Sequence, residues 1–148
     1  MSSYKIAIVI SQFNKEISDN LLEGALDEYD HIFEDSRSNI DIFDVPGAFE
    51  IPGTIMKILK NNKKYHAIIT LGNVIKGETA HFEYISSSVT DSISAISRQS
   101  NIPVIYGILT TYNYEQALER ADSNKKNKGG EVMDTAFKTI LAYNKIIK

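Results

Sequence analysis

The chain alternates between short, nearly continuous apolar runs and longer segments in which apolar residues recur at helical spacing. The short runs are rich in Ile and Val, and their lack of alternation is typical of strands buried on both faces of a parallel sheet. They cover Lys5–Ile10, Ile40–Val45, Ala67–Leu71 and Val104–Leu109. The pattern therefore predicts four buried strands.

The intervening segments place apolar residues three or four positions apart, which gathers them on one face of a helix. These stripes run from Ile17 to Tyr29, from Ile51 to Leu59, from Phe82 to Ile96 and from Met133 to Ile147, and Tyr114–Ala121 predicts a further short helix. Because strands and helices alternate, we expect an α/β three-layer sandwich. Its four-stranded parallel sheet would carry helices on both faces, as in flavodoxin-like folds.

Composition narrows the class of protein without pointing to a function. A chain of 148 residues, 43% hydrophobic and 24% charged, suits a single domain over residues 1–148. The net charge of −3 speaks against nucleic acid as a partner. No window approaches the roughly 20 apolar residues of a membrane span, and the start lacks the features of a signal peptide. Because cysteine is absent, we expect a cytoplasmic protein.

The predicted fold says where a ligand would bind. In open parallel sheets, ligands bind beyond the carboxyl ends of the strands. The segments expected there are Ser11–Asn14, Pro46–Glu50, Gly72–His81 and Thr110–Asn113.

The segment Gly72–His81 joins a strand to a helix and predicts an anion site. Gly77 permits a tight turn and a close approach of the backbone, and Thr79 is a suitable N-cap residue. The free N–H groups of a first helical turn favour phosphate, provided that Glu78 points away. His81, in that first turn, can transfer protons near neutral pH. The alternatives are an ordinary strand–helix junction and a structural histidine. No metal site is expected, because His81 has no second His or Cys nearby.

The segment Pro46–Glu50 lies between a strand and a helix and favours a flat ligand. Ala48 would let a ligand approach the backbone, Phe49 could stack on a planar ring, and Glu50 could accept hydrogen bonds from ligand hydroxyls. Alternatively, Phe49 is buried and Glu50 complements the helix dipole. Phe13 allows the same two interpretations, and two aromatic residues on such loops favour a flat aromatic ligand.

Two cationic residues lie late in the chain. Arg120 ends the predicted short helix, and Lys128 belongs to a basic run that precedes the last helix. Such runs are commonly solvated loops. The alternative is a phosphate clamp, for which the forked hydrogen-bonding geometry of arginine is well suited.

Taken together, these segments resemble the lumazine synthase family over most of the chain, from about Ile6 to about Phe137. Several separated motifs in the same order carry the resemblance. They are Phe13-Asn14, Val45–Pro52, Gly72 with Val74-Ile75, Gly77–Phe82, Glu115–Ala117 with Glu119–Ala121, and Asn127–Gly129.

The resemblance implies a reaction of riboflavin biosynthesis. The enzyme would condense 5-amino-6-(D-ribitylamino)uracil with 3,4-dihydroxy-2-butanone 4-phosphate to 6,7-dimethyl-8-ribityllumazine, releasing phosphate and water. No step is a redox step, so no cofactor and no metal are expected. Phe13 would stack on the pyrimidine, His81 would shuttle protons, and Arg120 would bind phosphate. The other implied substrate contacts are Ala48, Phe49, Glu50, Asn73, Val74, Ile75, Glu78 and Thr79. Tyr106, Lys128 and Arg120 would come from a neighbouring subunit.

Some positions depart from the family pattern. Lys76 stands where Arg is frequent, Asn73 is at a variable position, and Tyr106 stands where Phe is common. The connection Ala121–Lys128 has no glycine, and the N-terminal segment is short. These two features favour a pentamer or a pair of pentamers over an icosahedral shell, both with sites between subunits. The resemblance also implies an association with riboflavin synthase.

Three other functions fit parts of the sequence. An archaeal-type riboflavin synthase would share the fold, but the Gly77–Thr79 block with His81 speaks against it. A non-catalytic flavin- or lumazine-binding protein would not need His81, Arg120 and Lys128, which are all present. A flavodoxin-like phosphate-binding module would require a loop rich in Ser, Thr and Gly after the first strand, and Ser11–Asn14 does not provide one.

Overall fold

The computed structural model describes residues 4–33, 37–61 and 64–147. Its strands are β1 (Ile6–Ser11), β2 (Ile40–Val45), β3 (Ala67–Ile75), β4 (Val104–Ile105) and β5 (Ile108–Thr111). Its helices are α1 (Lys15–Ile32), α2 (Ile51–Asn61), α3 (His81–Gln99), α4 (Tyr114–Ala121) and α5 (Lys128–Ile146). Two short 3-10 helices, η1 (Arg37–Asn39) and η2 (Ala48–Glu50), flank β2.

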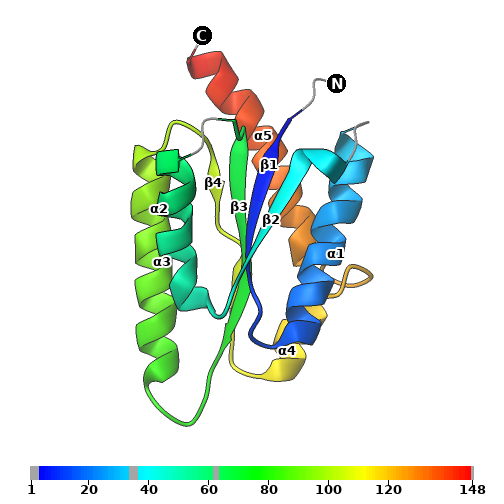
Figure 1. Cartoon of the computed structure of the whole chain (residues 1–148). Coiled ribbons are helices and arrows are strands. Elements are labelled where there is room, and N and C mark those ends of the chain that lie inside the picture. Colours follow the sequence, from blue (N-terminus) through cyan, green and yellow to red (C-terminus); the bar gives the residue numbers. More distant parts are fainter. Residues whose placement is uncertain (1–3, 34–36, 62–63, 148) are drawn as a thin grey trace.

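The strands form one parallel sheet with helices on both faces, which confirms the predicted three-layer fold (Figure 1). The order is β2-β1-β3-β4, and β5 also pairs with β3. Helices α2 and α3 cover one face, whereas α1, α4 and α5 cover the other. All residues of β1 are buried because this strand has a sheet neighbour on each side and a helix layer on each face.

The hydrophobic core has two halves, one on each face of the sheet. Ile6 and Ile8 of β1 pack toward α1 and α5, whereas Ala7 and Val9 pack toward α2 and α3. Successive strand side chains point to opposite faces, so both sets must be apolar when both faces are covered. This explains the continuous apolar runs in the sequence.

Two predicted strands have different bounds in the structure. β3 continues to Ile75 instead of ending at Leu71, because its last residues pair with β5. The run Val104–Leu109 is two strands, β4 and β5, separated by Tyr106 and Gly107. Both pair with β3 in the same register. At the break, the side chain of Thr70 replaces the ladder: its hydroxyl donates to the Ile105 carbonyl and accepts from the Gly107 N–H, both at 2.9 Å.

The predicted stripe of the last helix extends too far. It includes Ile147, but α5 ends at Ile146 and the Ile147 side chain is 63% exposed. Ile147 follows the apolar period but lies at the C-cap position, after the last residue of the helix.

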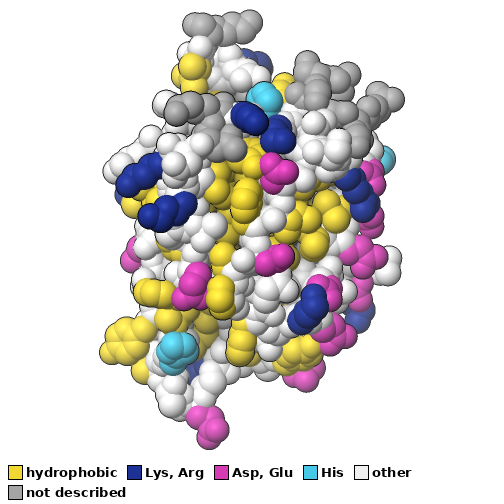
Figure 2. Space-filling model, in the orientation of Figure 1, with side chains coloured by type: hydrophobic (Ala, Val, Ile, Leu, Met, Phe, Trp, Pro, Cys, Tyr) yellow, Lys and Arg dark blue, Asp and Glu magenta, His cyan; other side chains and the backbone are white. Residues whose placement is uncertain are grey.

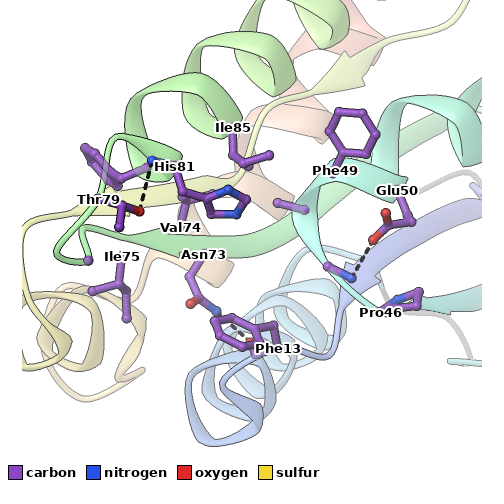
Figure 3. Close-up of a pocket in the computed structure, with 14 residues that line it drawn as sticks. Phe13, Pro46, Phe49, Glu50, Asn73, Val74, Ile75, Thr79, His81 and Ile85 are labelled. Carbon is purple, nitrogen blue, oxygen red and sulfur yellow. Dashed lines mark hydrogen bonds between the residues drawn. The ribbon is translucent and has the colours of Figure 1, made fainter.

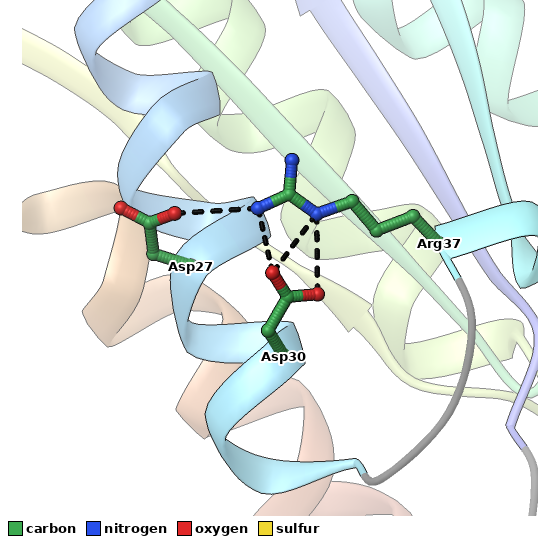
Figure 4. A network of polar contacts seen from close by, with 3 residues as sticks. All are labelled: Asp27, Asp30 and Arg37. Atoms are coloured by element: carbon green, nitrogen blue, oxygen red, sulfur yellow. Dashed lines mark hydrogen bonds and ion pairs between the residues drawn. The ribbon is translucent and has the colours of Figure 1, made fainter.

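A surface network fixes η1 against α1 (Figure 4). The Arg37 guanidinium is 3.3 Å from Asp27 Oδ1 and 2.7 Å from Asp30 Oδ2. Because the network is solvent-exposed, its ion pairs contribute little to stability. It links η1, just before β2, to α1.

The surface carries charges of both signs interspersed with hydrophobic side chains (Figure 2). Several large apolar residues are exposed, including Phe13, Phe49, Tyr84 and Tyr112. Within the described ranges, no helix is both long and apolar enough to cross a bilayer.

Candidate functional site

A pocket of about 620 Å³ opens beyond the carboxyl ends of β1, β2 and β3, as the parallel sheet predicts (Figure 3). It is lined by the segments that follow β1 and β2, by the last residues of β3, and by the segment that leads into the first turns of α3. The lining residues are Phe13, Pro46, Gly47, Ala48, Phe49, Glu50, Asn73, Val74, Ile75, Gly77, Thr79, His81, Phe82 and Ile85.

One side of the pocket is held by two asparagines. Asn14 has a left-handed backbone conformation, with φ of 59°, which Asn tolerates better than most residues. Its side-chain amide donates to Asn73 Oδ1 at 2.8 Å, and the Asn73 amide donates to the Phe13 carbonyl at 3.1 Å. These bonds fasten the loop after β1 to β3. The Phe13 ring remains 64% exposed at the pocket.

The adjacent side is a tight turn formed by Gly47 and η2, and the Pro46 carbonyl just before it accepts the Phe13 N–H at 3.1 Å. The Glu50 carboxylate accepts the Gly47 N–H at 3.0 Å, and the Glu50 N–H donates to the Gly47 carbonyl at 3.1 Å. These two bonds, one from the Glu50 side chain and one from its backbone, stiffen the turn. Ala48 is buried against the pocket, whereas the Phe49 ring is 59% exposed. Glu50 thus has the structural role considered for it, and it also lines the pocket.

The third side is the start of α3. The predicted N-cap at Thr79 is wrong: the N-cap residue is Ala80, and no side chain caps this helix end. Thr79 Oγ1 lies 3.4 Å from the His81 nitrogen, beyond the usual range for a strong N–H···O bond. N–H groups of the first turn therefore remain available to an anion.

Gly77 contributes space at this side. No atom lies within 4 Å of the position that a Cβ would occupy, and its φ is not in the left-handed region. A ligand can therefore approach the backbone here.

The imidazole of His81 extends from the start of α3 into the pocket (Figure 3). Phe82 and Ile85, which the apolar stripe predicts as core residues, also line the pocket. Their position in the first two turns of α3, close to His81 in the sequence, is the signal that places them at the pocket.

Four of the predicted site residues do not line this pocket. Glu78 lies in the adjacent loop but outside the lining. Arg120 and Lys128 line a separate depression of about 330 Å³. There Arg120 Nη1 donates to the Gln116 carbonyl at 3.1 Å, and Lys128 is 2.9 Å from Glu131.

The fourth, Tyr106, lies at the break between β4 and β5, where its hydroxyl is 2.8 Å from that of Thr90. Within one chain, the aromatic pocket and the cationic residues are therefore two separate sites. Over residues 4–33, 37–61 and 64–147, no group of three or more His, Asp and Glu residues could hold a metal ion.

The fold and the pocket define an α/β protein with an aromatic-lined pocket at the carboxyl ends of a parallel sheet, beside a helix N-terminus. A sequence model of the 6,7-dimethyl-8-ribityllumazine synthase family matches residues 3–144. Similar proteins include the 6,7-dimethyl-8-ribityllumazine synthases of Yersinia pestis (strain Pestoides F) and Yersinia pseudotuberculosis (serotype O:1b, strain IP 31758). Each is 43% identical over 136 residues, which cover 92% of this chain and 86% of the relative.

The chain therefore belongs to the 6,7-dimethyl-8-ribityllumazine synthase family. The family predicted from the sequence motifs is confirmed. The prediction of an enzyme of riboflavin biosynthesis that forms dimethylribityllumazine is supported with it.

Proposed function

We propose that the condensation of 5-amino-6-(D-ribitylamino)uracil with 3,4-dihydroxy-2-butanone 4-phosphate takes place in this pocket. The observation that carries the proposal is the combination of two exposed rings, Phe13 and Phe49, with His81 at an uncapped helix start. Exposed rings on a pocket rim suit a flat heterocycle, and the uncapped start of α3 suits the phosphate.

The pyrimidine and its ribityl chain would occupy the apolar part of the pocket. Phe13 stacks on the ring, Val74 and Ile75 at the end of β3 contact it, and Ala48 leaves room for it. Glu50 uses one carboxylate oxygen for Gly47. Its second oxygen is available to ribityl hydroxyls.

The phosphate would lie at the start of α3, at the backbone of Glu78 and Thr79. Phosphate leaves as an anion, so donors and positive charge placed beforehand lower the barrier. The helix start provides donors, and Arg120 and Lys128 of a neighbouring copy provide charge. His81 moves the protons of imine formation, elimination and ring closure. Holding two substrates together supplies much of the remaining rate gain.

The separation of the two sites within one chain supports an assembly with shared sites. We propose a pentamer or a pair of pentamers in which Tyr106, Arg120 and Lys128 complete the pocket of the adjacent copy. We place the assembly in the cytoplasm, with riboflavin synthase as an association partner. Sedimentation that shows a megadalton particle would contradict this oligomeric state.

The direct experiment mixes the purified protein with both substrates and follows the lumazine chromophore. Absence of product above the uncatalysed rate, from a folded oligomer, would refute the proposal. Arg120→Ala should lower kcat/KM for the butanone phosphate by about 100-fold, as expected for loss of a charged group that stabilises a leaving anion. Arg98→Ala is the matched control, because Arg98 is exposed near the end of α3 and bonds Ser94. Unchanged turnover of Arg120→Ala would remove Arg120 from the phosphate site.

A further inference from the structure

The backbone on both sides of Tyr106 is held by one buried side chain. Thr70, in the middle of β3, is fully buried, and its hydroxyl bonds the carbonyl of Ile105 and the N–H of Gly107. The residues immediately before and after Tyr106 are thus fastened to the same atom. This clamp fixes the direction in which the Tyr106 side chain leaves the sheet edge.

Gly107 leaves little freedom in this arrangement. A Cβ at this position would overlap the Thr70 carbonyl oxygen and would lie 2.8 Å from Val132 Cγ2. The backbone after Tyr106 therefore packs directly on β3 and α5. The break between β4 and β5 therefore has a fixed backbone conformation, and Tyr106 lies at this break.

The far end of the Tyr106 side chain is tethered as well. Its ring is 36% exposed, and its hydroxyl is 2.8 Å from the hydroxyl of Thr90 on α3. Thr90 is itself exposed on the helix surface. With its backbone clamped by Thr70 and its hydroxyl bound by Thr90, the ring has a defined orientation before any partner arrives.

We propose that Thr90 is a positioning residue that holds Tyr106 in the orientation required to line the neighbouring copy's pocket. This inference rests on the proposed function, in which Tyr106 completes that pocket. Once a neighbour covers the ring, its hydroxyl loses contact with water and needs a partner within the chain. Thr90 supplies this partner.

The test is a pair of variants with opposite effects. Thr90→Val keeps the shape of the side chain but leaves the Tyr106 hydroxyl unpaired. We expect KM for ribitylaminouracil to rise about three- to tenfold, the range expected for the net loss of one hydrogen bond, with a smaller change in kcat. Adding Tyr106→Phe removes the unpaired hydroxyl. The double variant Thr90→Val/Tyr106→Phe should return to within about twofold of the wild-type KM.

Recovery of KM in the double variant distinguishes a positioning role of Thr90 from a structural one. If Thr90→Val only damaged the helix, that damage would persist in the double variant. Thr139→Val is the matched control, since the Thr139 hydroxyl bonds a carbonyl of its own helix. An unchanged KM in Thr90→Val, or a raised KM that Tyr106→Phe does not restore, would overturn the inference while leaving the proposed function intact. An inactive wild-type protein would overturn the proposed function, and this inference with it.

Discussion

Asn73 has both polar groups of its side chain hydrogen-bonded, to Asn14 and to the backbone of Phe13. Asn73 is 2% exposed, and its side chain is already bonded within the chain, where it holds the loop after β1. Phe13 and Phe49 show the opposite behaviour, because their rings are more than half exposed. Asn73 therefore fastens the loop after β1, whereas the rings of Phe13 and Phe49 remain exposed.

A second buried polar residue near the pocket lacks such partners, and it gives a stability prediction. Among the described residues, Ser11 is fully buried and its hydroxyl has no hydrogen-bond partner. Ser11→Ala should therefore leave the free energy of unfolding unchanged or raise it by up to about 1 kcal/mol. Ser18→Ala is the matched control: its buried hydroxyl donates to the Ser11 carbonyl at 2.6 Å, and its loss should cost about 1–2 kcal/mol. Urea unfolding measures both, and a clear loss in Ser11→Ala would contradict the prediction.

At the scale of elements, the starts of the strands are joined by a polar cluster far from the pocket. The Tyr65 hydroxyl, just before β3, donates to Asp41 of β2, and Lys5, just before β1, lies 3.5 Å from the same carboxylate. Burial and the bond to Asp41 raise the pKa of Tyr65 to about 12. The bond from Tyr65, together with Lys5, lowers the pKa of Asp41. The cluster therefore joins the segments before β1 and β3 to β2, through contacts that depend on the protonation states of Asp41 and Tyr65.

The pH dependence of this cluster follows from the two shifts. Because the folded-state pKa of Tyr65 is raised, its contribution is complete below the unfolded value of 10.0 and is lost as pH rises through about 12. Because the pKa of Asp41 is lowered, its contribution is present above the unfolded value of 3.8 and is lost in acid. Tyr65→Phe should be less stable than wild type by about 1 kcal/mol at pH 7.

Urea unfolding at several pH values tests this prediction. The difference between Tyr65→Phe and wild type should shrink between pH 10 and about 12, the window set by the Tyr65 shift. Tyr84→Phe, at an exposed tyrosine, controls for the loss of a hydroxyl. A difference that stays constant across this window would show that the bond to Asp41 does not stabilise the fold.

At the scale of the whole molecule, the central feature is that the aromatic pocket and the cationic depression are separate in one chain. Arg120 and Lys128 face Thr110 and Glu131, whereas the pocket is built from the ends of β1, β2 and β3. The shared active site that we propose would make assembly a condition of activity, and mixing subunits tests that condition.

Mixed oligomers should recover activity that neither parent has. Phe13→Asp places a charge in the ring slot and disables the pocket half, while Arg120→Ala disables the cationic half. Dissociated and reassembled together in equal amounts, the two variants should regain roughly a quarter of the wild-type rate, because about one site in four receives two intact halves. Each variant reassembled alone is the control. No gain on mixing, from oligomers shown to contain both variants, would place the whole site within one chain.

The sequence by itself determined the elements and the layers. A strand covered on both faces needs a continuous apolar run, and a helix packed on a sheet needs apolar residues three or four positions apart. Both patterns can be read from the sequence alone. The fixed geometry of parallel sheets then places the segments around Phe13, Phe49 and His81 at one edge. For this reason the sequence also located the pocket.

Only the tertiary structure decided the remaining features, because they depend on partners distant in the sequence. β3 continues through Gly72 and Asn73, residues of low strand preference, since β5 is there to pair with them. The Asn73 side chain is hydrogen-bonded to the loop after β1. The Thr70 hydroxyl takes the place of a backbone bond where the edge strand is interrupted at Tyr106. Local periodicity records which faces are buried, but hydrogen bonds between distant residues decide where a strand ends and which side chains remain free to act.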